Sequence, residues 1–410
     1  MEAIIKPTLW TKNFTFIISG TIVSAIGGVG LNLALSVTVY NHTQSTWLMG
    51  LYSAITIIPG MILPVLLSPF IDRYPRKKII VRQDLFMGVM FIFFAWWTHT
   101  RAFDFYFYLL MGLVISINGV IYGLAYNSLF PNLIPKGMFQ KGYAIGNLIY
   151  PLTNVVALPV ATLVFKHFGV ASLFLVEGFL LLIAVVFEMH IEITETTEQV
   201  VGNPVKNHFL DIKKGFDYLR KEPCIGYIYA FFVVMMFSQG ITVLVYPFFE
   251  HRAHLQVMNY AFLLSFESAG YMFGGLMHYF IKIPTKSRYG ISVIVYAAFA
   301  VFGGAFFFMP FTIMLITKFF LGFIGMNSAN IRVTSINHYI DDSMRGRLNA
   351  IFQTLVSVAT LSGRLLAGYL GERVSYEVIG ILYGSLIGIG MLLFIIKRKA
   401  IVMPLYNQEL

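Results

Sequence analysis

The sequence predicts an all-α membrane protein with twelve transmembrane helices in two pseudo-symmetric halves of six helices each. Of the 410 residues, 58% are hydrophobic and 12% are charged, which is about half the charge of an ordinary soluble domain. The apolar residues form long continuous runs along the whole chain, without the period of two that a transmembrane β-strand requires. The two halves of the chain also repeat the same spacing of loops and apolar runs.

Each predicted helix is an apolar run between charge clusters or Pro and Gly residues. A helix needs about 20 apolar residues to cross the hydrocarbon core of a bilayer, and every run reaches about that length. The predicted spans are residues 13–40, 47–71, 79–100, 104–129, 139–166, 169–190, 224–249, 255–281, 289–309, 312–338, 345–370 and 375–396.

Basic residues predict the orientation of these helices. Of the 29 Lys and Arg residues, 22 fall in the two terminal segments, in the alternate loops that would share their side of the membrane, or in the first turn of a span that begins on that side. The positive-inside rule therefore predicts a cell-membrane protein with both termini in the cytoplasm. The net charge of +10 then reflects topology and contact with anionic lipids, and it does not indicate binding of nucleic acid.

The longest gap between spans lies near the middle of the chain. Within it, Phe209, Ile212, Phe216 and Leu219 share one helical face, which predicts an amphipathic helix on the cytoplasmic surface of the membrane. An offset of about 207 residues aligns the loop after the second span with the loop after the eighth. The predicted domains are an amino-terminal bundle, a linker, a carboxy-terminal bundle and a cytoplasmic tail, over residues 1–190, 191–223, 224–396 and 397–410.

A charge inside an apolar span indicates a functional site or an ion pair. Glu267 lies about a dozen residues into the eighth span, beside Ser265 and Ser268. A carboxylate at this depth suits a group that binds and releases protons or that contacts substrate. The alternative is a structural ion pair with Arg364 of the eleventh span or Arg332 of the tenth.

Other charges lie nearer the predicted membrane surfaces. Glu177 and Lys318 are weaker candidates for proton coupling or substrate contact, because long side chains near an interface can reach water. Glu188 is expected to be solvated at the inner membrane edge. Arg332 and Arg364 favour an anionic group on the substrate, whereas Glu267 favours a cation or a proton.

Amide and phenol side chains recur at helical spacing in two spans. They are Asn118, Tyr122 and Tyr126 in the fourth span, and Asn327 and Asn330 in the tenth. A cavity with such residues among Phe and Met side chains suits a small amphipathic organic substrate better than a sugar or an inorganic ion. Packing between helices and against lipid accounts for most of the other aromatic residues.

One loop resembles the signature of a transporter family. The segment Ser68-Pro-Phe-Ile-Asp-Arg-Tyr-Pro-Arg-Lys-Lys78 resembles the major facilitator superfamily pattern small-x-x-x-Asp-Arg-x-Gly-Arg-Lys, with Ser68 and Pro75 in place of its two glycines. The segments Ser45-Thr-Trp-Leu-Met-Gly50 and Arg345-Gly-Arg-Leu-Asn349 are similar to the branch that contains macrolide efflux proteins and the enterobactin exporter.

This resemblance implies the major facilitator fold and secondary active transport by alternating access. We therefore expect an antiporter that uses the proton gradient to export a drug, macrolide-like compound or siderophore. The sequence contains no nucleotide-binding, nucleophile or metal-ligand motif, so we predict no enzyme activity, cofactor or metal. Protons, lipids and the substrate are the expected partners of a monomer. A lipid or lysolipid translocator, or a non-transporting sensor on the same fold, are alternatives.

The signature loop also predicts a conformational latch. Asp72 ends the second span, and it can interact with the positive end of the eleventh helix, which begins near Asp342. Breaking such a contact would shift the balance between inward-open and outward-open forms. The predicted latch residues are Asp72, Arg73, Arg76, Asp84 and Asp342.

Overall fold

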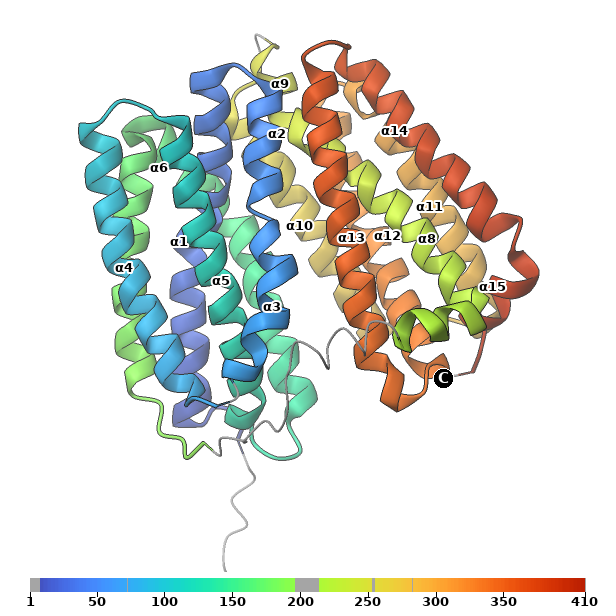
Figure 1. Cartoon of the computed structure of the whole chain (residues 1–410), viewed down its shortest axis with the longest axis horizontal. Helices are drawn as coiled ribbons and strands as arrows, with labels where there is room; N and C mark the ends of the chain where they lie inside the picture. Colours follow the sequence, from blue (N-terminus) through green and yellow to red (C-terminus); the bar gives the residue numbers. More distant parts are fainter. Residues whose placement is uncertain (1–7, 72, 196–213, 253–254, 282, 410) are drawn as a thin grey trace, which may run out of the picture. The chain divides into compact units, whose positions relative to one another are not determined.

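The computed structural model describes residues 8–71, 73–195, 214–252, 255–281 and 283–409. Within these ranges the chain is almost entirely helical and contains no β-strand, as predicted (Figure 1). Ten helical segments in them are long and apolar enough to cross a membrane, so this is a multi-pass membrane protein. The count of twelve spans stays a prediction.

Six helices account for the first half of the chain. The predicted second span contains two of them, because the helix is interrupted at Thr56 and Ile57. The predicted fifth and sixth spans are joined in a single 51-residue element. In chain order the helices are α1 (Lys12–Thr43), α2 (Thr46–Ile55), α3 (Ile58–Ile71), α4 (Arg76–Thr100), α5 (Phe105–Leu133) and α6 (Phe139–Met189).

Helix α6 is two helices joined at a glycine. Gly169 has φ 76° and ψ −177°, a conformation that L-residues with a side chain rarely adopt. A Cβ placed on Gly30 of α1 would meet both Ala161 and Leu173, while Glu188 lies against Gly20. The second half of α6 therefore runs back along α1, antiparallel to the first half. Two of the predicted spans account for this one element.

The second half of the chain contains α-helices broken by short 3₁₀ and π-helical turns. The predicted seventh and twelfth spans each contain such a turn. The elements are α8 (Pro223–Ser238), η1 (Gln239–Leu244), α9 (Val245–Glu250), α10 (Val257–Phe280), η2 (Thr285–Ser287), α11 (Arg288–Gly304), η3 (Phe306–Phe308), α12 (Phe311–Tyr339), α13 (Asp342–Gly371), α14 (Tyr376–Gly390), η4 (Met391–Ile396) and α15 (Lys399–Tyr406).

The chain divides into two compact units. The N unit comprises Met1–Thr38 and Ile62–Pro204, and the C unit comprises Val39–Met61 and Val205–Leu410. The end of α1 and all of α2 therefore pack with the C unit, although the predicted domains follow chain order. The predicted division into domains over residues 1–190, 191–223, 224–396 and 397–410 stays a prediction.

Helix α2 packs tightly on α13 within the C unit. Gly50 and Gly368 face each other, and a Cβ on Gly50 would lie 3.2 Å from the Cα of Gly368. At the start of α2, the Ser45 hydroxyl and the Trp47 N–H (3.2 Å) both donate hydrogen bonds to the Glu372 carboxylate. Small residues thus bring the backbones together, and one acid caps the amino end of α2.

Two segments outside the main helices differ in how far the structure describes them. The predicted tail includes α15, whose Tyr406 is fully buried and shares a 2.9 Å hydrogen bond with the Tyr296 hydroxyl. That part of the tail is therefore a packed helix of the C unit. In the predicted linker, residues 214–221 are helical, and the remainder of the predicted amphipathic helix, with Phe209 and Ile212, lies outside the described residues.

Candidate functional site

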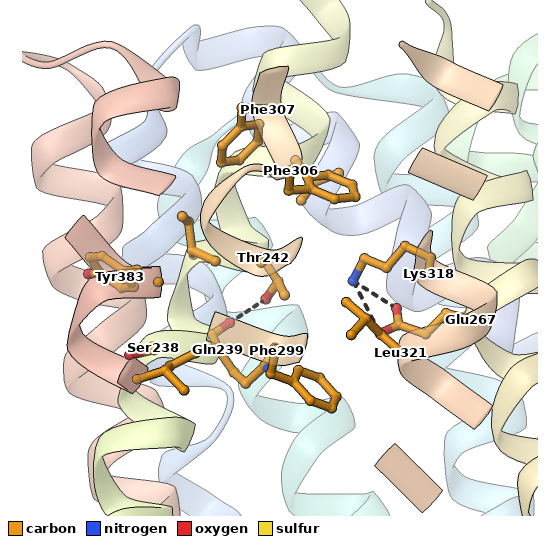
Figure 2. Close-up of a pocket in the computed structure, with 15 residues that line it drawn as sticks. Ser238, Gln239, Thr242, Glu267, Phe299, Phe306, Phe307, Lys318, Leu321 and Tyr383 are labelled. Carbon is orange, nitrogen blue, oxygen red and sulfur yellow. Dashed lines mark hydrogen bonds and ion pairs between the residues drawn. The ribbon is translucent and has the colours of Figure 1, made fainter. Parts of the chain in front are cut away.

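A cavity inside the C unit contains the most prominent predicted residue, Glu267. The cavity has a volume of about 50 Å³, enough for a few water molecules. Pockets that enclose a drug-sized ligand measure roughly 300–1,000 Å³, so this cavity is at most part of a substrate site. Its lining combines aromatic and small polar side chains with one acid and one base: Gln239, Thr242, Phe299, Phe306, Phe307, Tyr383, Glu267 and Lys318 (Figure 2).

The acid and the base form an ion pair. The Lys318 ammonium lies 3.1 Å from each oxygen of the Glu267 carboxylate. The Lys318 side chain is 11% exposed and that of Glu267 is 20% exposed. The ammonium also lies 5.7 Å from the centre of the Phe306 ring, within the range of a cation–π contact. Both charges are therefore largely removed from water and neutralise each other.

Glycines bring the two helices that carry this pair into close contact. A Cβ on Gly322 of α12 would overlap the Glu267 carbonyl, and a Cβ on Gly270 of α10 would overlap the Phe319 carbonyl. Because the backbones of α10 and α12 are in contact, the Lys318 side chain of α12 reaches Glu267 of α10. Lys318, a weaker candidate by sequence because it lies nearer an interface, thus binds an acid inside the unit through its ammonium.

Neither predicted arginine partner reaches Glu267. Arg364 of α13 donates a hydrogen bond to the Ser53 carbonyl at 3.3 Å, and its buried Nε has no partner in the described part of the chain. The Arg332 guanidinium lies against two rings, 4.2 Å from the centre of Phe232 and 4.7 Å from that of Phe352. The predicted alternative of an ion pair between Glu267 and either arginine is therefore wrong.

The polar residues predicted on α12 are only partly satisfied. The Asn327 amide donates a 2.7 Å hydrogen bond to the Phe323 carbonyl of its own helix, while its Oδ1 is buried without a partner in the described chain. Asn330 is half-buried one turn further along. An unfilled acceptor of this kind can receive a hydrogen bond from a ligand or from water.

The N unit contains three buried acids on two helices. Asp84 of α4 is 3% exposed, and Glu177 and Glu188 of α6 are 4% and 0% exposed. The Tyr122 hydroxyl donates a 3.3 Å hydrogen bond to Oε1 of Glu188. Each acid has one buried carboxyl oxygen without a hydrogen-bond partner in the described chain. The expectation that Glu188 is solvated is therefore wrong, because the second half of α6 turns it toward the interior.

Glycines of α1 make room for two of these acids. A Cβ on Gly27 would overlap the Glu177 carboxylate, and one on Gly20 would lie 3.3 Å from Cγ of Glu188. On α5, Tyr122 and Tyr126 stack with ring centres 5.9 Å apart. The same helix carries Asn118, whose Oδ1 is buried without a partner among the described residues. The predicted polar residues of the fourth span therefore share the N unit with the three acids.

The predicted latch is only partly described by the structure. Asp72 lies outside the described residues, so its contact with the eleventh span stays a prediction. Arg73 is exposed, and Asp342 forms a 2.5 Å ion pair with Arg345 in the first turn of α13. Asp84 is buried, and its Oδ2 has no hydrogen-bond partner in the described chain. Its predicted support of the latch stays a prediction.

An acid that the sequence did not single out caps α4. Glu195 accepts hydrogen bonds from the backbone N–H groups of Arg76 (2.7 Å) and Lys77 (3.0 Å). Its carboxylate also lies 3.9 Å from the Arg76 guanidinium. A carboxylate is stabilised at this end of a helix by the free N–H groups and the helix dipole. The residues are 119 positions apart in the sequence, so no local signal predicts the contact.

The sequence of this chain is similar to those of known membrane transporters. The sequence model of the Major Facilitator Superfamily matches residues 15–335. An uncharacterized transporter of this type, YvqJ from Bacillus subtilis (strain 168), is 23% identical and aligns with 96% of this chain and 94% of its own length. Macrolide efflux protein A of Streptococcus pyogenes is 21% identical over 92% of this chain and 94% of its own.

Two further relatives bear on the fold and on the predicted branch. The enterobactin exporter EntS of Shigella boydii serotype 4 (strain Sb227) is 22% identical over 84% of this chain and 82% of its own. Among solved structures, the nucleoside transporter NupG superposes with a TM-score of 0.73 at 15% identity, covering 95% of this chain and all of that one. At this identity the superposition shows a common fold and nothing about substrate.

Proposed function

Because the chain belongs to the major facilitator superfamily, a family of membrane transporters, we propose that it is a proton-coupled exporter of an amphipathic organic compound. The similarity to a macrolide efflux protein and to an enterobactin exporter supports export of a drug-like or siderophore-like molecule. In this proposal the protein works by alternating access in the cell membrane, with both termini in the cytoplasm.

The observation that carries the proposal is the Glu267–Lys318 pair on the wall of an aromatic cavity. Figure 2 shows the pair on one side of the cavity and Tyr383 on the other. Binding sites for organic molecules combine apolar walls with a few polar groups that fix orientation. A polar or charged group on the substrate can compete with either member of the pair, and the rings can contact its apolar part.

The pair also sets a requirement on the substrate. Separating two charges that are largely removed from water leaves each of them without its partner, which costs about 3–5 kcal/mol when nothing replaces it. A substrate must therefore return hydrogen bonds or opposite charge to the separated groups. This condition favours amphipathic compounds with polar groups over purely apolar molecules.

Flux measurements in proteoliposomes test the proposal. Radiolabelled erythromycin and enterobactin are the two substrate arms, a labelled lysophospholipid is the third, and a pH gradient is imposed in either direction. Wild-type protein is expected to move one of the first two compounds in response to the gradient. Flux of the lysophospholipid alone would identify a lipid translocator, and no flux in any arm would contradict the exporter proposal.

Variants of the pair test its role in the same assay. Glu267→Gln and Lys318→Gln are expected to lower flux at least about tenfold, which corresponds to about 1.4 kcal/mol of lost interaction. The matched control is Glu377→Gln, which removes the acid of another pair in the C unit, 3.8 Å from Arg252 and outside the cavity lining. Equal losses in all three variants would show that the cavity pair has no special role.

A further inference from the structure

Two of the three buried acids of the N unit lie against α1. Glu188 lies against Gly20 and Glu177 against Gly27, which are seven residues or about 10 Å apart along the helix. Asp84, from α4, interacts electrostatically with both glutamates. The three carboxyl groups thus lie near one another in the interior of the unit, and together they form an acid cluster.

The groups that face this acid cluster provide no counter-charge. Among titratable side chains, the acids interact with one another and with three phenols, Tyr122 and Tyr126 of α5 and Tyr150 of α6. Helix α1 contributes glycines at the contact, and no ion pair among the described residues includes any of the three acids. The titratable groups of the cluster are therefore acids and phenols.

Unpartnered oxygens in this acid cluster indicate a missing ligand. Each acid is more than nine-tenths buried, and each has one carboxyl oxygen that makes no hydrogen bond within the described chain. A buried carboxylate without a partner costs several kcal/mol, and three neighbouring negative charges would repel one another as well. The small ligand that removes the charge of a carboxylate and needs no further space is a proton.

We propose that Asp84, Glu177 and Glu188 bind and release the protons that drive transport, and that Glu267 does not. The step is an acid–base exchange: the O–H bond of a carboxylic acid breaks when water reaches the acid cluster, the proton passes to water, and the carboxylate remains. The reverse step takes a proton from the other side of the membrane. This inference rests on the proposed function, because it assigns residues to the coupling that the function assumes.

The cavity pair provides the contrast within the same molecule. Glu267 has an ammonium 3.1 Å from both oxygens, so its negative charge is already balanced. It needs no proton to remain buried. The position of Glu267 deep in its predicted span made it the first candidate for a proton carrier. The geometry instead assigns it to substrate contact.

Infrared spectroscopy of the purified protein tests the inference without any substrate. The carbonyl band of a protonated carboxylic acid is separate from the bands of a carboxylate, so a pH titration in lipid nanodiscs reports which acids hold protons. Wild-type protein is expected to show protonated-acid bands at neutral pH, and Asp84→Asn, Glu177→Gln and Glu188→Gln are each expected to remove part of them. Glu267→Gln is the matched control and should remove none.

Two outcomes would overturn the inference. One is a wild-type spectrum without protonated-acid bands at neutral pH, which can be recorded even if a variant fails to fold. The other is loss of such a band in Glu267→Gln with no loss in the three N-unit variants. Both readouts are independent of transport.

A transport measurement separates the inference from the proposed function. Using whichever of erythromycin or enterobactin the wild type carries, the three N-unit variants are expected to lose accumulation driven by the pH gradient but to keep substrate exchange at equal pH. Glu267→Gln is expected to lose both. Wild-type transport that ignores the pH gradient would contradict the proposed proton coupling itself, whereas N-unit variants with unchanged pH-driven accumulation would contradict only the residue assignment.

Discussion

The buried acids of the N unit and of the C unit have opposite surroundings. In the C unit, Glu267 has Lys318 as its partner, and the two charges balance. In the N unit, Asp84, Glu177 and Glu188 are buried more deeply, yet no base of the described chain pairs with them. A carboxyl group thus has two environments in this protein. They differ in the presence of a basic partner more than in how deeply the group is buried.

The difference arises from the helix that faces each acid. Glu177 and Glu188 are eleven residues apart, about three turns, so both point at α1, where glycines leave room but offer no charge. Glu267 points at α12, and the residue there is Lys318. A base on the neighbouring helix is what separates the paired Glu267 from the unpaired acids of the N unit.

The largest expected effect comes from removing the base of the C unit. Lys318→Met leaves Glu267 buried beside Phe306 without a counter-charge and is expected to destabilise the protein by about 3–5 kcal/mol. Thermal unfolding in detergent measures the loss. The variant should also gain a protonated-acid infrared band, because Glu267 is then in the situation of the N-unit acids.

The double variant Glu267→Met with Lys318→Met provides the control for this prediction. Replacing both charges by apolar groups removes the unpaired acid and is expected to recover most of the lost stability. A double variant as unstable as Lys318→Met would show that the lysine stabilises the fold through packing and that the comparison between the units is wrong.

An intermediate effect is expected from closing the space beside an N-unit acid. Gly27→Ala places a Cβ on the Glu177 carboxylate, and displacing the side chain should cost about 1–3 kcal/mol. Gly123→Ala is the control, because a Cβ there meets no atom within 4 Å and alanine favours helix by up to about 1 kcal/mol. Thermal unfolding of the two variants compares them, and equal midpoints would contradict a tight acid site at α1.

The smallest effect concerns an exposed acid of the N unit that does have a base. Lys12 donates a 2.9 Å hydrogen bond to Glu192, and this contact lowers the pKa of Glu192 below its usual value. A lowered pKa in the folded state stabilises the protein above the unfolded-state pKa of about 4.3, and the gain disappears as the pH falls through the folded-state value.

Lys12→Met tests that sign. The variant is expected to unfold at a slightly lower temperature than wild type near pH 7, and the difference should vanish near about pH 3, where the acid is protonated in both states. High salt should also reduce the difference, because the pair is exposed. A difference that grows as the pH falls would contradict the prediction.

Helix positions followed closely from the apolar runs. The third span is predicted over residues 79–100 and α4 covers Arg76–Thr100, and the eleventh is predicted over 345–370 and α13 covers Asp342–Gly371. The breaks inside spans were not predicted, because the apolar run continues through Thr56 and Ile57 and through η1. Hydropathy indicates which segments can lie in lipid, but it does not indicate where an α-helix is interrupted or changes to a 3₁₀ turn.

The sequence identified several residues of the site, but it did not predict which residues contact each other. Glu267, Glu177 and Lys318 stood out because a charge inside an apolar run needs a reason. The sequence misplaced Glu188, since a residue near the end of a run can face lipid, water or the interior according to how the helix is rotated. It also missed Glu195, which caps a helix more than a hundred residues away.

The sequence alone determined that this protein is helical and lies in a membrane, because the scarcity of charge and the length of the apolar runs are properties of composition and order. The tertiary structure decided which charges meet. Glycines on α10 and α12 bring Lys318 to Glu267, while glycines on α1 enclose Glu177 and Glu188 without a base. The rotation and close approach of helices control these contacts, and neither is encoded in any single segment of the chain.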